Sequence, residues 1–151
     1  MRAAKTYSYR DDDKVPPFPD DHPLIVFDGI CVLCSGFVRF VLRHDKANRY
    51  RFLAAQSGLA AALYHHYGLS TDVWETNLLL AGGRLFIRSE AAIEIVTNFG
   101  GWWRLIKILR LIPRPLRDWL YDRVAGNRYR WFGRHEFCVM PDPTFADRFL
   151  A

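Results

Sequence analysis

One stretch of the chain, from Leu24 to Cys34, constrains the fold more than any other. Its first four residues are apolar and two of them are β-branched, which favours a buried strand. Asp28-Gly29 is a turn signal, and the apolar run Phe37 to Leu42 beyond the two cysteines suits a helix. We therefore predict a strand, a tight turn and a helix whose first turn carries both sulfur atoms.

Cys31 and Cys34 are three residues apart, a spacing that places two side chains on one face of a helix and within disulfide reach. A helix start favours negative charge, because its first amide groups are unpaired and the macrodipole is positive there. Such sites lower a cysteine pKa from about 8.5 to roughly 3.5–7.5, so Cys31 is predicted to be the attacking thiolate. Cys34 lies one turn deeper, where burial disfavours charge, and is predicted to be the resolving thiol.

Asp28 precedes Cys31 by three residues, and the sequence leaves two roles open for it. Its carboxylate can accept or return the proton of the buried thiol, since thiol exchange needs a thiolate at each step. Alternatively, it can cap the helix by bonding to amides of the turn. Both roles can hold together, although a carboxylate very close to Cys31 would oppose the thiolate.

Two segments of the chain are similar to a known family. Asp28 to Cys34 resembles the Asp-x-x-Cys-x-x-Cys signature of the DCC family, a group of predicted thiol-disulfide oxidoreductases with a thioredoxin-like fold. Tyr121 to Arg134, followed by Cys138, resembles the closing segment of that family. The resemblance brackets residues 24 to 138 and implies thiol-disulfide exchange of the protein-disulfide reductase type.

The rest of the pattern adds a strand, a helix, a hairpin and a further helix, predicted over residues 49–53, 54–67, 76–80 with 84–88, and 89–98. Ser89 is the predicted N-cap of the last of these helices. The order β-α-β-α-β-β-α most simply gives a parallel pair, a hairpin and a covering helix. It is also the order of the thioredoxin fold. We predict an α/β, thioredoxin-like core with a C-terminal helical extension.

One departure from the thioredoxin pattern precedes the third core strand. Thioredoxins and glutaredoxins place a cis-proline there, facing the dithiol. In this chain Val73 to Asn77 occupies that place and contains no proline. Docking of a substrate backbone in the manner of thioredoxin is therefore not expected.

The N-terminal residues 1–22 are predicted to form a loose arm, and residues 23–151 a single domain that includes the C-terminal helices. The arm contains the charge run Asp11 to Lys14 and several prolines, which prevent regular strand pairing. Residues 1–10 lack the apolar segment of a secretion signal, so the cytoplasm is the expected location. Three cysteines in a reducing compartment do not indicate a structural disulfide framework.

The segment Trp102 to Ile112 is predicted to be a basic amphipathic helix, followed after Pro113-Arg114-Pro115 by a helix from Leu116 to Ala125. Two interpretations are open. The first helix covers the sheet with its arginines extended to solvent, or it contacts a membrane surface or a partner. No apolar run approaches the roughly 18 residues of a membrane span, so only peripheral membrane contact is considered.

The net charge of +5 is mild and favours acidic partners without indicating a nucleic-acid protein. Arginines alternate with aromatic residues between Arg128 and Arg134, a pattern that can bind single-stranded nucleic acid. The pattern is short and isolated. We expect its aromatic side chains to pack inward, its arginines to face solvent, and no nucleic-acid partner.

A zinc site is the main alternative to redox chemistry. His135 and Cys138 form a His-x-x-Cys pair that, with Cys31 and Cys34, would complete a closed tetrahedral structural site. The chain would then be a non-enzymatic zinc-stabilised module, or a basic adaptor on an acidic partner. Against zinc, an apolar strand leads into the first cysteine pair, whereas zinc loops usually lie on turns. Cys138 can also be a third redox thiol or a thiol without a role.

We therefore predict a thiol-disulfide oxidoreductase whose site residues are Cys31, Cys34 and Asp28, with no organic cofactor and no metal. Its substrate would be a protein or small-molecule disulfide. Electrons would come from another dithiol protein or from glutathione.

Overall fold

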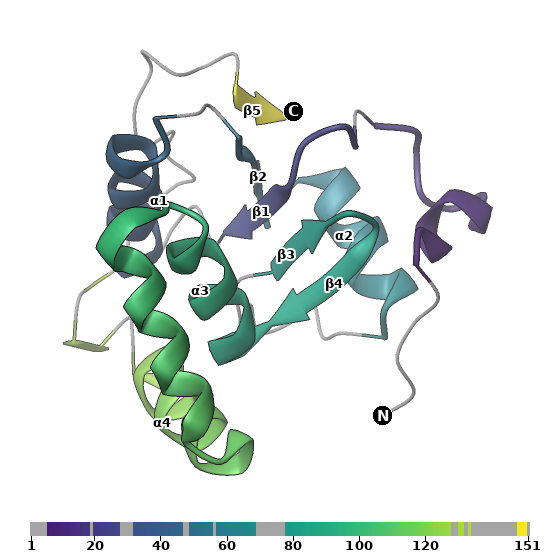
Figure 1. The fold of residues 1–151 in the computed structure, drawn as a ribbon. Helices are drawn as coiled ribbons and strands as arrows, with labels where there is room; N and C mark the ends of the chain where they lie inside the picture. The colour runs from purple at the N-terminus through teal and green to yellow at the C-terminus, as the bar shows by residue number, and fades with distance from the viewer. Residues whose placement is uncertain are drawn as a thin grey trace.

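The computed structural model describes residues 6–18, 20–27, 32–46, 49–55, 57–68, 78–127, 130–131, 133 and 148–150. For residues 32–35, 88, 125 and 150 it describes the backbone only. The elements in chain order are η1 (Ser8–Asp11), β1 (Leu24–Phe27), α1 (Val32–His44), β2 (Arg51–Ala54), α2 (Gly58–His66), β3 (Leu78–Ala81), β4 (Arg84–Ile87), α3 (Arg88–Thr97), η2 (Gly101–Leu111), α4 (Arg114–Gly126) and β5 (Phe149–Leu150). The order from β1 to α3 is the one predicted, and the fold is α/β and thioredoxin-like (Figure 1).

The sheet has the strand order β4-β3-β1-β2-β5, with β1 at its centre. β1 runs parallel to β2, where Val26 pairs with Leu53, and antiparallel to β3, where Val26 pairs with Leu78. β1 and β2 therefore end at the same edge of the sheet, and β3 begins there. The chain leaves β1 toward the two cysteines at that edge.

Helices cover both faces of the sheet because the side chains of β1 alternate between the two faces. Ile25 and Phe27 pack with buried residues of α1 and α3, whereas Leu24 and Val26 pack with α2 and the N-terminal arm. All four are at most 1% exposed. The core is thus divided into two layers by a fully buried central strand.

Two helix starts differ from the sequence prediction. α2 begins at Gly58 rather than near residue 54, because Ala54 is still paired in β2 and the hydroxyl of Ser57 accepts the amide proton of Ala60 at 3.2 Å as the N-cap. α3 begins at Arg88, so Ser89 lies inside the helix instead of capping it. The Ser89 hydroxyl donates a hydrogen bond of 2.6 Å to Asp118 and so links α3 to α4.

The described part of the N-terminal arm is packed rather than loose. Tyr9 and Val15 are only 4% and 7% exposed and belong to the core layer under α2. His66, at the end of α2, holds the arm from both ring nitrogens. Its Nε2 lies 2.8 Å from the Ser8 hydroxyl, and its Nδ1 lies 2.8 Å from the carboxylate of Asp12. The charge run alone indicated a solvated arm. The residues that bind the arm lie more than fifty residues away in the sequence, so no local pattern could show these contacts.

The C-terminal extension differs from the expected pair of α-helices. η2 is a 3-10 helix with no buried residue, and it packs against α3 rather than covering the sheet. The interpretation of a sheet-covering helix is therefore wrong for this segment. β5 adds a strand parallel to β2, with Phe149 paired to Phe52, which the sequence pattern did not predict.

Tyr50 gives the core a predicted sensitivity to alkaline pH. Its side chain is 1% exposed, and burial raises the pKa of its phenol to about 12. Because the folded-state pKa is raised, the stabilisation is complete below the unfolded pKa of about 10 and is lost as pH rises toward 12. Urea unfolding across this range should show a loss that is about 2–3 kcal/mol larger in the unchanged protein than in Tyr50→Phe. An equal loss in Tyr50→Phe would contradict the assignment to this phenol.

Candidate functional site

In the sequence, the two cysteines fall between the end of β1 and the first turn of α1. β1 ends at Phe27, α1 begins at Val32, and the backbone of Cys34 is in the first turn of α1, as predicted. Asp28, Cys31 and the side chain of Cys34 lie outside the described residues, so their distances and the role of Asp28 stay predictions. The structure therefore describes the strand before the motif and the helix after it.

α1 is fixed firmly on the sheet, which holds its N-terminus at the edge where β1 ends. Val38 and Val41 are fully buried and pack in the layer that contains Ile25 and Phe52. The first turn of α1 has no acidic residue, and its last turn has the basic Arg43 and His44. The basic residues thus suit the negative end of the helix macrodipole, and no acidic side chain of the first turn offsets its positive end.

A second helix start lies at the same edge. The amide of Ala55 donates to the carbonyl oxygen of Phe27 at 2.7 Å, which joins the end of β2 to the end of β1. The chain then passes through Ser57 into α2. The first amide groups of α1 and α2 therefore lie near the end of β1, where they favour an anion such as a thiolate.

The strand that follows the position of the thioredoxin cis-proline begins at this edge. β3 begins at Leu78, which pairs with Val26, one residue before the end of β1. Val73 to Asn77 lies outside the described residues, so the expectation of an altered substrate-docking mode stays a prediction. The pairing explains why this segment is relevant to the dithiol: the antiparallel β3 enters the sheet where β1 leaves it.

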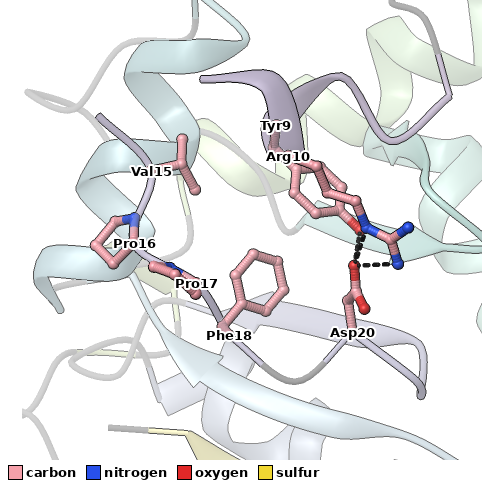
Figure 2. Close-up of a pocket in the computed structure, with 7 residues that line it drawn as sticks. All are labelled: Tyr9, Arg10, Val15, Pro16, Pro17, Phe18 and Asp20. Carbon is pink, nitrogen blue, oxygen red and sulfur yellow. Dashed lines mark hydrogen bonds and ion pairs between the residues drawn. The ribbon is translucent and has the colours of Figure 1, made fainter. Parts of the chain in front are cut away.

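A pocket of about 240 Å³ lies in the N-terminal arm, and its lining includes none of the predicted site residues. Its polar wall is internally satisfied, as Figure 2 shows: the carboxylate of Asp20 accepts hydrogen bonds from the Tyr9 hydroxyl at 2.9 Å and from Arg10 Nε at 2.8 Å. The hydrogen bond from Arg10 holds the pKa of Asp20 below its usual value, and burial raises the pKa of Tyr9. The three polar side chains of the pocket are therefore paired with one another.

The remaining candidate residues are only partly described. His135 and Cys138 lie outside the described residues, so the zinc alternative stays untested. Trp131 is 57% exposed, so the expectation that it packs inward is wrong. No helix in the described ranges is long and apolar enough to cross a membrane.

Comparison with known proteins places this frame in a family. Residues 25–134 match the model of the DCC1-like thiol-disulfide oxidoreductase family. The chain belongs to that family. It is 35% identical over 127 residues to the uncharacterized protein YuxK of Bacillus subtilis, covering 84% of this chain and 93% of that protein. It is 37% identical over 122 residues to a chloroplastic DCC family protein of Arabidopsis thaliana, covering 80% and 71% of the two chains. No solved structure matches the chain significantly.

Proposed function

We propose that this member of the DCC1-like family is a thiol-disulfide oxidoreductase of the protein-disulfide reductase type, with Cys31 and Cys34 as its redox-active dithiol. The observation that carries the proposal is the position of the motif, which follows the buried central strand and leads into the first turn of α1. Cys31 directly precedes the helix start, where unpaired amides stabilise a thiolate. Asp28 supplies or accepts protons at the same turn.

The proposed reaction moves two electrons from the dithiol to a substrate disulfide. The Cys31 thiolate attacks one substrate sulfur, forms a mixed disulfide and releases the other sulfur as a thiolate. Cys34 then attacks the Cys31 sulfur, which frees the second substrate thiol and leaves an intramolecular disulfide. An external dithiol protein or glutathione reduces that disulfide and restores the starting state.

The setting of the reaction is part of the proposal. A reducing compartment suits a dithiol that donates electrons, and we propose the cytoplasm, as expected from the sequence. The name of the Arabidopsis relative places that protein in the chloroplast. Protein and small-molecule disulfides are both candidate substrates, because the chain lacks a proline between residues 69 and 77 to align a substrate backbone as thioredoxins do.

The proposal is tested by reducing insulin disulfides with dithiothreitol in the presence of the protein. We expect acceleration by the unchanged protein, and a rate equal to dithiothreitol alone for Cys31→Ser, because the attacking sulfur is gone. Cys138→Ser is the matched control and should keep the activity. Absence of any acceleration would contradict the proposal. One zinc per chain that is lost on replacing His135 or Cys138 would instead support the structural metal site.

The role of Asp28 is tested by Asp28→Asn. Asparagine caps helices about as well as aspartate, so the midpoint of urea unfolding should stay unchanged. If Asp28 moves protons, the exchange rate should fall about 100-fold at the pH optimum, and the pH–rate profile should lose one titration step. An unchanged pH–rate profile would restrict Asp28 to capping.

A further inference from the structure

The exposed apolar side chains of this protein are concentrated in one segment. Ten large apolar residues are at least 39% exposed among the described residues, and all of them lie between residues 102 and 131. Four of these belong to one row on η2: Trp102, Leu105, Ile108 and Leu111 are 68%, 71%, 65% and 81% exposed. Apolar surface gathered in this way marks an interaction site rather than ordinary solvent-facing surface.

The 3-10 geometry of η2 explains how this row forms. From Trp102 onward the sequence repeats two apolar residues and one basic residue in steps of three. A 3-10 helix has about 3.0 residues per turn, so residues three apart are eclipsed and form straight rows. One row contains Trp103 and Ile106, both half-buried, the next is the exposed apolar row, and the third contains Arg104, Lys107 and Arg110. We call the exposed apolar row together with the basic row the η2 strip.

The half-buried row fixes the orientation of the η2 strip. The ring of Trp103 lies 5.5 Å from Phe40 and 5.2 Å from His44 of α1, and 6.0 Å from Phe99 beyond α3. On the basic row, Arg110 forms an ion pair of 2.8 Å with Glu94 of α3. Because these contacts hold one side of η2 against α1 and α3, the exposed apolar row is directed away from the core.

The net positive charge of the chain is concentrated in the same segment. Residues 101–131 contain eight Lys and Arg residues and two Asp residues, a net charge of +6, whereas the whole chain carries only +5. The remainder of the chain therefore has a net charge of −1. Arg104 and Lys107 are both exposed on the basic row, directly beside the exposed apolar row. The partner of this surface must therefore accept apolar side chains and carry negative charge.

We propose that the η2 strip binds an anionic membrane surface. An anionic bilayer meets both requirements, since apolar side chains enter the acyl boundary while basic side chains contact lipid phosphates. Tryptophan, present in the row as Trp102, favours this interfacial depth. η2 is about 22 Å long at roughly 2 Å per residue, shorter than the 30 Å hydrocarbon core of a typical bilayer, so it lies in the plane of the interface. A second copy of the chain fits less well, because a symmetric contact through the strip brings like charges together.

The test uses the full chain and two kinds of vesicle, one of pure phosphatidylcholine and one containing phosphatidylglycerol. In flotation assays we expect binding to the anionic vesicles only, reduced by high salt. Arg104→Gln with Lys107→Gln should weaken the partition coefficient about 25-fold, as each basic residue near an anionic surface contributes roughly a factor of five. Leu105→Asn with Ile108→Asn should weaken it on the order of 100-fold, because two apolar side chains no longer enter the lipid.

The matched control removes two exposed positive charges elsewhere, by Arg43→Gln with Lys46→Gln near the end of α1. This control should float with the anionic vesicles as the unchanged protein does. Equal weakening by the control would show that net charge alone drives binding and would overturn the proposal. Equal binding to both vesicle types, or no binding, would also overturn it. So would a dimer in analytical ultracentrifugation that Leu105→Asn with Ile108→Asn dissociates, since the strip would then be covered by a second copy.

Discussion

Replacing Cys34 by serine is expected to trap a long-lived mixed disulfide between Cys31 and a disulfide substrate. In the proposed reaction Cys31 is the attacking thiolate and is unchanged in this variant, so the first exchange step should proceed. The second step should stop, because the proposed role of Cys34, in the first turn of α1, is to supply the sulfur that releases the product. Mass spectrometry of the intact protein after exposure to substrate should show an adduct on nearly every chain, and peptide mapping should place it on Cys31.

Cys31→Ser is the decisive counterpart. It removes the predicted nucleophile and leaves Cys34, whose predicted burial one turn deeper would raise the pKa of its thiol and slow attack. We expect almost no adduct on this variant under the same conditions. If adducts collect on Cys34 in Cys31→Ser as readily as on Cys31 in Cys34→Ser, the two sulfurs have equal roles and our assignment is wrong.

The core of the fold was predictable because its signals are local. Four consecutive apolar residues in β1 are buried on both faces, and the turn residues after them separate the strand from α1. The hairpin of β3 and β4 follows in the same way from the glycines between the strands. These elements depend on periodicity and turn chemistry, which a single sequence displays.

The parts that were missed depend on distant partners. Asp12 and Ser8 have the composition of a solvated arm, and their contacts with His66 depend on the fold, which places the end of α2 beside them. Asp45 and Arg148 are separated by 103 residues, so no local pattern indicates that they pair. Local signals located the strand and the helix that flank the candidate site, whereas the turn between them and the geometry of the two sulfurs stay predictions.

The segment after α3 shows how two helical periods compete. Its apolar and basic residues suit an amphipathic α-helix over a few turns, which is the basis of the sequence prediction. Over eleven residues the strict repeat of three matches the 3-10 helix better, and η2 takes that form from Gly101 to Leu111. The repeat of three was present in the sequence, and its assignment to the period of an α-helix was wrong.

The largest change in stability is expected at the buried ion pair between Arg148 and Asp45. These residues are 3% and 7% exposed, and Arg148 also donates to the carbonyl oxygen of Tyr50 at 3.0 and 3.1 Å. Asp45 in turn accepts the amide protons of Arg49 and Tyr50 at 3.1 and 2.8 Å. The pair thus ties the chain before β5 to the start of β2, at the edge of the sheet.

Arg148→Met should lower the free energy of unfolding by about 3–5 kcal/mol, because it leaves the carboxylate of Asp45 buried without its cation. Arg114→Met is the matched control. It breaks an ion pair with Asp118 whose arginine is 60% exposed, and it should cost at most about 1 kcal/mol. In urea unfolding, Asp45→Asn combined with Arg148→Met should cost less than the two single changes added together, since the pair is then removed as a unit. A loss from Arg148→Met no larger than that of the control would contradict this prediction and would mean that the amides of Arg49 and Tyr50 suffice to hold the Asp45 carboxylate.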